Sequence, residues 1–122
     1  MKDIVDEINI VDTGSTDKTV EIAKRYTDRV FFFEWIGDFA AARNESFKHA
    51  TKDYILYLDA DDVLLEEDQK KLKELKETLD PSVDSVSMYY DISFNSACTS
   101  SNVIYGSINL IMRDPHLSFF GF

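Results

Sequence analysis

The sequence has 122 residues, enough for one domain and too few for two, so we expect residues 1–122 to form a single domain. A formal net charge of −10 argues against nucleic acid and anionic membrane surfaces as direct partners. One cysteine excludes an internal disulfide and a cysteine-based zinc cluster. The chain shows neither a signal-peptide pattern nor a membrane-spanning stretch, and therefore predicts a cytoplasmic protein without a transmembrane segment.

Three short apolar runs in the first half of the chain predict β-strands. Residues 7–11 (EINIV) predict a strand that ends at Asp12, and residues 29–35 (RVFFFEW) predict a second strand. Residues 53–59 (DYILYLD) predict a third, which ends at Asp59. Its continuous apolar run is typical of a strand that is covered on both faces.

Helical patterns follow each of these strands. Ser15 or Thr16 is placed to cap a helix after the first strand. A second helix is expected from about residue 38, with Phe39 on its apolar face. Residues 66–79 predict the clearest helix, because acidic residues stand at its start and lysines stand later, as the helix dipole favours.

The last third of the chain changes to the period of a β-strand. Apolar and polar residues alternate from 86 to 94, residues 95–102 read as a polar loop, and a second strand or bent pair is expected over 104–112. The order of elements predicts an α/β fold with a mostly parallel sheet, flanking helices and an antiparallel β extension.

An acidic cluster follows the third predicted strand. In YILYLDADD, residues 54–62, the apolar run leads directly into Asp59, Asp61 and Asp62. Ligands of open α/β sheets collect at the carboxyl ends of parallel strands, where Asp12 is also expected. Oxygen ligands without nearby cysteine or histidine favour Mg²⁺ or Mn²⁺. The alternative is that the aspartates only cap the following helix in a solvated loop.

Three segments give the chain a family resemblance. IVDTGSTDKT (10–19), AAARNESFKHA (40–50) and YILYLDADD (54–62) occur in the order and spacing of the family 2 inverting glycosyltransferases, which have the Rossmann-like GT-A fold. Within that family, the chain resembles bacterial members with tandem helical repeats and glycosyltransferases that modify peptides. Each motif alone has modest specificity, and the three together are specific.

The resemblance implies a donor site for a nucleotide-diphosphate sugar, normally a UDP-sugar, with the acceptor left unknown. Asp12 would accept a hydrogen bond from the uracil base, and Gly14 would allow the tight turn behind it. Arg43 would lie near the diphosphate or the base, with Asn44 beside it. Two of these roles have plainer alternatives: Asp12 could simply begin an Asx turn, and Arg43 could be a surface cation paired with Asp38 or Glu45.

The resemblance also gives roles to the acidic cluster, which reads as the family's DXD motif. Asp59 would hold the ribose hydroxyls, and Asp61 would bind the Mn²⁺ or Mg²⁺ ion that bridges the two phosphates. Asp62 would orient the loop or a metal-bound water. Trp35 could stack on a base or sugar, although aromatic residues more often lie in the core.

Compared with the family, the chain reads as truncated at both ends. The family's first strand lies between the strands that end at Asp12 and Asp59, and residues 1–5 resemble only the tail of the helix that follows it. Either those two strands pair directly, or a second copy fills the gap by strand exchange, which predicts a homo-oligomer. No catalytic residue is assigned, because the family's general base comes later than Phe122, and neither Asp91 nor Asp114 lies in the family's motif.

Two other classes of protein also place aspartates at strand ends. LDADDVL fits a haloacid-dehalogenase-type phosphatase with Asp59 as nucleophile and Asp61 as acid, although that motif normally lies on the first strand. A response-regulator receiver has a similar length. It requires a lysine on its last strand, and no lysine occurs after Lys76.

Overall fold

The computed structural model describes residues 3–59, 62–91 and 105–112, and the fold is given for these residues. The chain divides into two units, each described by itself. The first comprises Met1–Asp53 with Arg113–Phe122, and the second comprises Tyr54–Met112. The elements in chain order are β1 (Ile10–Asp12), α1 (Thr19–Ala23), β2 (Val30–Phe32), α2 (Phe39–Lys48), β3 (Tyr54–Leu56), α3 (Glu66–Thr78), β4 (Ser85–Asp91) and β5 (Tyr105–Met112).

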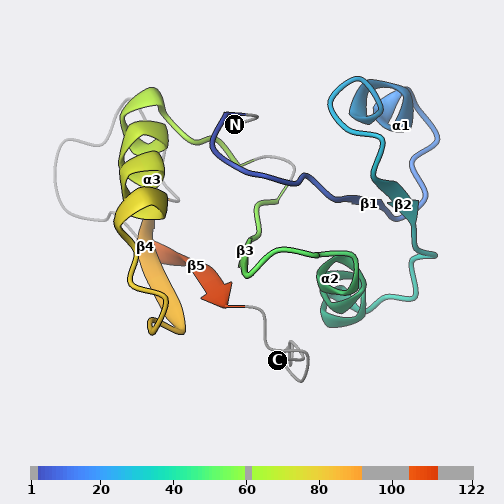
Figure 1. Cartoon of the computed structure of the whole chain (residues 1–122). Helices are drawn as coiled ribbons and strands as arrows, with labels where there is room; N and C mark the ends of the chain where they lie inside the picture. Colours follow the sequence, from blue (N-terminus) through green and yellow to red (C-terminus); the bar gives the residue numbers. More distant parts are fainter. Residues whose placement is uncertain (1–2, 60–61, 92–104, 113–122) are drawn as a thin grey trace, which may run out of the picture. The chain divides into compact units, whose positions relative to one another are not determined.

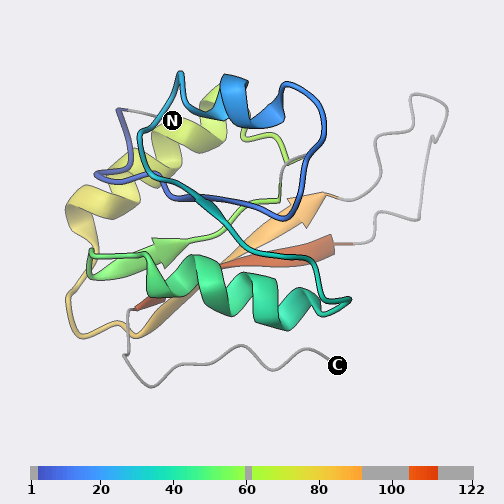
Figure 2. The same ribbon diagram turned by 90° about the vertical axis from the view of Figure 1, so that its right-hand side faces the viewer.

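A short parallel strand pair lies at the centre of the first unit. β1 pairs with β2 in parallel, with Ile10 opposite Val30 and Asp12 opposite Phe32. Figures 1 and 2 both show α1 on one side of this pair and α2 on the other. This β–α–β–α arrangement confirms the parallel pairing expected from the sequence, although each strand is shorter than the apolar run that predicted it.

The starts of the two helices in this unit differ in how they are capped. α2 begins where the sequence predicted, and Asp38 caps it, because its Oδ1 atom accepts a hydrogen bond from the Ala41 amide at 3.0 Å. The prediction that Ser15 or Thr16 caps α1 is wrong, since α1 begins only at Thr19 and has no side-chain cap. The physical reason is that Asp12 accepts hydrogen bonds from the Ser15 amide, which keeps residues 12–15 in a turn.

The second unit contains an antiparallel sheet in the order β3-β5-β4. β4 and β5 pair from Ser85 opposite Ile111 to Asp91 opposite Tyr105, which confirms two strands in the last third of the chain. At the start of β4, Ser85 and Ser87 are exposed and Val86 and Met88 are half-buried, as the alternating pattern predicted. Residues 95–102, the predicted loop, lie outside the described residues.

The pairing of β3 corrects one detail of the predicted sheet. β3 pairs antiparallel with β5, with Tyr54 opposite Met112, and belongs to a different sheet from β1. The direct pairing of β1 with β3 that the sequence left open is therefore absent from the pairings of the described strands. β5 provides the reason, because this long strand offers one edge to β4 and the other to β3. The α/β class with parallel and antiparallel parts is nevertheless confirmed.

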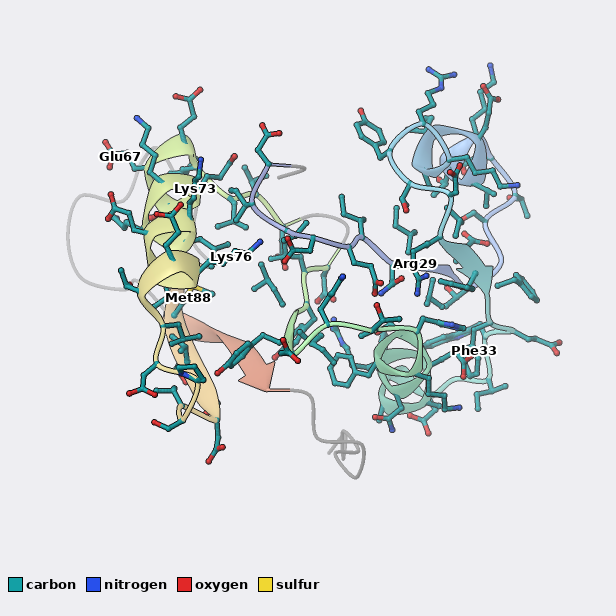
Figure 3. All side chains as sticks on the ribbon, in the orientation of Figure 1. Arg29, Phe33, Glu67, Lys73, Lys76 and Met88 are labelled. Carbon is teal, nitrogen blue, oxygen red and sulfur yellow. The ribbon has the colours of Figure 1, made fainter. Side chains whose placement is uncertain are left out.

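Helix α3 is close to its predicted range. Glu66, Glu67 and Asp68 stand in its first turn and Lys76 in its last, and Figure 3 labels Glu67, Lys73 and Lys76 along it. Leu72 is only 6% exposed and is the buried residue of this helix, whereas Leu65 at its N-cap position is 62% exposed. The chain becomes extended at Leu79, two residues before Pro81, since the residue before a proline disfavours the helical conformation and helices end at or before it.

The deeply buried apolar core of the described residues is small and consists of Ile4, Ala23 and Leu72. Phe39 was expected on the buried face of α2 but is 82% exposed, because it stands at the first position of the helix. Within the described ranges, no helix has both the length and the apolar character needed to cross a membrane.

Candidate functional site: the carboxyl ends of β1 and β3

The carboxylate of Asp12 lies at the carboxyl end of β1. Its Oδ2 atom accepts hydrogen bonds from the Gly14 and Ser15 amides, both at 3.1 Å, and Oδ1 accepts a longer one from the Ser15 amide at 3.3 Å. The backbone carbonyl of Asp12 accepts a hydrogen bond from the Phe33 amide at 2.9 Å, so both ends of the residue are fixed. The Asx turn proposed as the plainer alternative is therefore present.

This turn does not use the full hydrogen-bonding capacity of Asp12. A carboxylate has about four lone-pair positions, so Oδ1 keeps capacity for another donor. Asp12 is only 9% exposed, which makes it the one deeply buried polar residue among those described. Hydrogen bonds from Ser15 lower the pKa of the Asp12 carboxyl; burial raises it, and a further bond from Gly14 lowers it, leaving the pKa below its usual value. The turn thus holds an ionised acceptor in place.

Gly14 contributes a backbone conformation that other residues rarely adopt. Its φ angle is +115°, in the region that strongly favours glycine. A Cβ atom built at this position would meet nothing within 4 Å. Gly14 is therefore required by the path of the chain, and not by a close approach of another group.

Arg43 and Asn44 lie on α2, in the same unit as Asp12, and both are half-buried. The two carboxylates proposed as plain partners of Arg43 make other contacts. Asp38 caps the helix, and Glu45 contacts Lys48 at 2.8 Å and His49 at 3.2 Å. The first unit thus brings Asp12, Gly14, Arg43 and Asn44 into one small βαβα segment.

Asp59 and Asp62 follow β3 in the second unit and are joined by two hydrogen bonds. The Asp62 amide donates to the Asp59 carbonyl at 3.1 Å, and the Asp59 amide donates to Asp62 Oδ2 at 2.8 Å. The second bond joins the Asp62 side chain to the backbone at Asp59. Asp61 lies between them in the sequence but outside the described residues.

The start of α3 argues against the capping alternative. α3 begins at Glu66, its N-cap residue is Leu65, and no side chain caps it. Asp59 and Asp62 therefore do not cap this helix. The described residues contain no group of three or more histidine, cysteine, aspartate or glutamate side chains arranged to hold a metal ion. Because Asp61 is not among those residues, its role as a metal ligand stays a prediction, as does the convergence of Asp12 with Asp59.

Exposed aromatic residues follow β2. Trp35 and Phe39 contact each other edge to face, with ring centroids 4.7 Å apart, and Trp35 is partly exposed. The structure thus contradicts a simple core position for Trp35. Sequence reasoning also missed Glu7 and Arg29, whose contacts join the segments of β1, β2 and α2. The signal available was a pair of opposite charges at the first positions of two predicted strands.

These features define an α/β protein with carboxylates after β1 in one unit and after β3 in the other, and strand ends are the usual place for a ligand in such folds. The sequence profile described as glycosyl transferase family 2 matches residues 2–120, and the chain therefore belongs to this family. This membership confirms the family inferred from the three motifs and leaves the phosphatase and receiver alternatives without support.

Individual relatives agree with this assignment. The chain is 44% identical over 73 residues to a TPR repeat-containing protein of Synechococcus elongatus, covering 60% of this chain and 18% of that protein. It is 34% identical over 82 residues to the SPbeta prophage-derived glycosyltransferase SunS of Bacillus subtilis, covering 66% of this chain and 19% of that protein. It is 36% identical over 73 residues to an uncharacterized glycosyltransferase of Rickettsia felis, covering 60% and 25% of the two chains.

The chain spans about a fifth to a quarter of the length of these curated relatives. No solved structure gave a significant match. The family and the fold class are therefore established by the sequence profile and by the arrangement of the elements.

Proposed function

We propose that this chain carries the donor-binding part of a glycosyltransferase and binds a nucleotide-diphosphate sugar, with UDP as the nucleotide. The observation that carries the proposal is the buried Asp12 carboxylate, which the Gly14 and Ser15 amides hold ionised at the carboxyl end of a parallel strand. Uracil presents an N–H group, and an ionised acceptor with free lone-pair capacity is suited to receive it. Arg43 and Asn44 would contact the base or the diphosphate.

Glycosyl transferase family 2 domains generally use a divalent metal ion, and we propose Mn²⁺ or Mg²⁺ for this one. Asp61 would hold the ion and Asp59 the ribose hydroxyls. The donor set supports this assignment, because Asp59 and Asp62 supply carboxylate oxygens, the ligands that these ions prefer, and neither residue caps α3. When bound, such an ion would offset the charge that develops on the nucleoside diphosphate leaving group. The chain's own residues would bind and orient the donor.

Calorimetry with UDP, with and without Mn²⁺, tests the proposal. We expect binding that depends on the metal, since two phosphate groups and an acidic loop repel each other without it. The matched control is uridine, which keeps the base and ribose but lacks the phosphates, and its weaker binding should not depend on the metal. UDP binding that does not depend on Mn²⁺ would contradict the role of Asp61. The absence of any UDP binding would contradict the donor site.

We further propose that the chain forms a homo-oligomer by strand exchange. The support is that β1 and β3 lie in different sheets, and each pairs along one edge with a described strand. A strand from a second copy could pair with an open edge, which is otherwise a site of uncontrolled association. Light scattering during size-exclusion chromatography tests this, and a monomeric mass at all accessible concentrations would contradict it. The sugar and the acceptor are not assigned, and the cytoplasmic location stays a prediction.

A further inference from the structure

We propose that Glu7 and Arg29, with Asn9, His49 and Thr51, form a positioning cluster that fixes α2 along the direction of β1. We call this position of the helix its height. The proposal rests on the proposed function, because the residues that this cluster would bring level are Asp12 and Arg43. The five residues of the cluster come from three segments: the chain before β1, the residue before β2 and the residues just after α2. All of them belong to the first unit.

Arg29 is the centre of the cluster. Its Nε atom donates to Asn9 Oδ1 at 2.6 Å, and its Nη2 atom donates to the His49 carbonyl, also at 2.6 Å. The guanidinium carbon also lies 5.8 Å from the centre of the Phe31 ring. One rigid, planar group therefore bonds the segment before β1 and the C-terminal end of α2 at the same time.

Glu7 makes a second connection between the same segments. Its carboxylate accepts hydrogen bonds from the Thr51 amide at 3.0 Å and from the Thr51 hydroxyl at 2.5 Å. It also accepts one from Asn9 Nδ2 at 2.8 Å and lies 3.7 Å from Arg29 Nη2. The side chain of Glu7 is only 11% exposed, against 40% for Arg29, so solvent weakens this connection less than an ordinary surface pair.

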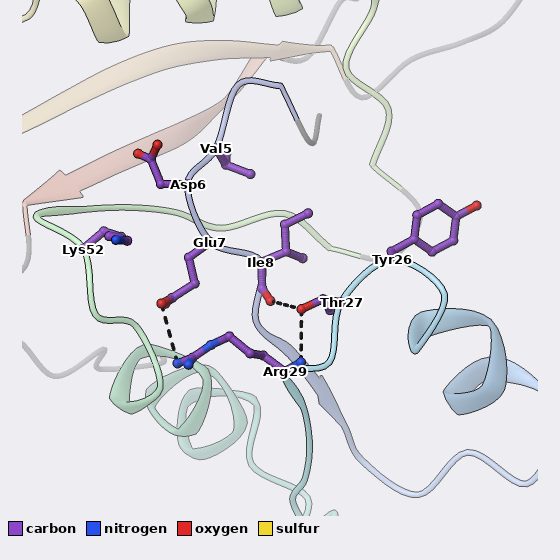
Figure 4. Close-up of a pocket in the computed structure, with 8 residues that line it drawn as sticks. All are labelled: Val5, Asp6, Glu7, Ile8, Tyr26, Thr27, Arg29 and Lys52. Atoms are coloured by element: carbon purple, nitrogen blue, oxygen red, sulfur yellow. Dashed lines mark hydrogen bonds and ion pairs between the residues drawn. The ribbon is translucent and has the colours of Figure 1, made fainter.

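The backbone of Arg29 is fixed as well, as the close-up in Figure 4 shows. The Thr27 hydroxyl donates to the Ile8 carbonyl at 2.8 Å and accepts from the Arg29 amide at 3.1 Å. The Arg29 carbonyl accepts from the Ile10 amide at 3.0 Å. Arg29 and Glu7 lie on the wall of an open hollow of about 390 Å³, but their polar groups face each other and not a ligand space.

The end of α2 has one more contact with the strands. The His49 ring stacks on Phe31, with centroids 3.6 Å apart and planes inclined by 3°. Since the last residues of α2 lie against the start of β2, the helix runs antiparallel to β2, as Figure 2 shows. The cluster therefore lies at the end of the unit opposite to the carboxyl end of β1.

The advance per residue along the strand and along the helix relates the position of the cluster to that of the candidate site. From Arg29 to Phe32, which pairs with Asp12, an extended chain advances about 10 Å. From His49 back to Arg43, an α-helix rises about 9 Å. Because Arg29 bonds the His49 carbonyl, these nearly equal advances bring Arg43 to the height of Asp12. A slip of one residue at the cluster would move Arg43 by about 1.5 Å along the helix axis.

The variant Arg29→Lys tests the positioning role. It keeps the charge but removes the planar fork that bonds Asn9 and His49 together. The matched control is Arg25→Lys, because the described side-chain contact of Arg25 is an exposed ion pair with Glu21 of α1, which is not part of the cluster. We expect Arg29→Lys to weaken UDP binding in the presence of Mn²⁺ about tenfold, since misplacement of a binding group is costly. Arg25→Lys should leave the dissociation constant unchanged.

A second measurement reads the height of α2 without any ligand. A nitroxide label at Thr13→Cys, in a Cys98→Ser background, relaxes nearby amides in NMR spectra. The amides of Arg43 and Asn44 should relax most strongly in α2. In Arg29→Lys, the strongest relaxation should shift along α2 or spread over neighbouring residues. A merely structural loss lowers the melting temperature but leaves this pattern unchanged in the folded molecules. Asn9→Ala, which removes the acceptor of Arg29 Nε, should reproduce the shift if Arg29→Lys does not fold.

The outcomes separate this proposal from the proposed function. If UDP does not bind the unaltered chain, the donor site is wrong, and the cluster is judged by the relaxation pattern alone. An unchanged pattern in Arg29→Lys and Asn9→Ala would overturn the positioning role, whatever happens to UDP binding. A shifted pattern with unchanged UDP affinity would overturn the connection between α2 and the donor site.

Discussion

Different interactions stabilise the inside of each of the two units of this chain. In the first unit the strands β1 and β2 are short, and side-chain bonds of Glu7, Thr27 and Arg29 join segments far apart in sequence. In the second unit, a continuous backbone ladder joins β4 to β5. The comparison teaches that the part carrying Asp12 and Arg43 depends on individual polar side chains, whose replacement changes geometry as well as stability.

The largest effect is expected at the acidic cluster. Replacement Asp61→Ala should abolish metal-dependent UDP binding, because it removes the proposed ligand of the ion. The melting temperature without metal should stay equal or rise, since one of several crowded like charges is lost. Titration calorimetry and thermal unfolding measure the two effects. Asp84→Ala is the matched control, an exposed aspartate of the same unit, and should change neither. A large loss of stability in Asp61→Ala would indicate a structural role for this carboxylate.

The stability of the second unit should depend on apolar burial. Leu72→Ala removes a side chain that is 6% exposed and should lower the free energy of unfolding by about 2–4 kcal/mol. Leu65→Ala, at the 62% exposed N-cap position of the same helix, should cost much less. Denaturant unfolding followed by circular dichroism gives both values. Equal losses at the two positions would contradict the assignment of Leu72 to the core.

The turn at Gly14 should show a backbone effect without a packing effect. Gly14→Ala should lower the free energy of unfolding by about 1–2 kcal/mol, because alanine is strained at a φ angle of +115°. No neighbour lies within 4 Å of the added Cβ, so Gly14→Ser should cost about as much, despite its larger side chain. A much larger loss for serine would show that space, and not conformation, selects glycine here.

Acid should loosen the first unit before the second. The pKa of Asp12 is lowered mainly by hydrogen bonding with Ser15. For Glu7, burial alone would raise the pKa, but hydrogen bonds from Thr51 and Asn9 lower it overall. Groups with a lowered folded pKa stabilise above their usual values, here 3.8 for aspartate and 4.5 for glutamate, and lose this contribution as pH falls below them. Hydrogen exchange between pH 5 and pH 3 should therefore accelerate first in residues 7–15.

A control variant isolates the contribution of Asp12 to this acid response. Asp12→Asn cannot titrate, so the exchange of the Gly14 and Ser15 amides should then vary less with pH, after correction for the intrinsic rate. In the second unit, Asp80 also has a lowered pKa, through hydrogen bonds from Ser82, but this contact is local and exposed. Simultaneous loosening of both units would contradict the difference between them.

The smallest effect is expected at Arg25, just after the end of α1. Arg25→Ala removes the exposed ion pair with Glu21, whose nitrogen and oxygen lie 2.8 Å apart. Exposed pairs with this spacing on a helix contribute about 0.3–0.5 kcal/mol, and salt screens them. Thermal unfolding at low and at high salt should show a loss that disappears at high salt. A loss above about 1 kcal/mol would mean that α1 contributes to the first unit through more than local contacts.

Much of the fold could be predicted because its signals are local. The apolar runs located β1, β2 and β3, and the alternating pattern located β4. The acidic start of α3 located that helix. Capping was less predictable: Asp38 fitted the rule, whereas the start of α1 moved to Thr19 because Asp12 competes for the Ser15 amide. That competition depends on where β1 ends, which the pattern of residues does not define.

The candidate site shows the same division. The motifs identified Asp12, Gly14, Arg43 and Asn44, and the structure brings these four residues into one unit. The Asx turn and the lowered pKa of Asp12 both follow from local hydrogen bonds. The Thr-Gly-Ser sequence after Asp12 already indicated such a turn as an alternative. The contacts of Arg29 with Asn9 and His49 had no sequence signal of comparable strength, because they join residues about 20 positions apart.

By itself, the sequence determined the family, the order of helices and strands, and the residues that carry the proposed donor chemistry, since motif spacing and hydrophobic period are written along the chain. Only the tertiary structure decided that β3 pairs antiparallel with β5, that Asp59 and Asp62 bond to each other without capping α3, and that Arg29 joins three segments. The physical reason is that strand partners and side-chain acceptors are chosen by proximity after the chain has folded, and many distant residues could satisfy the same donor.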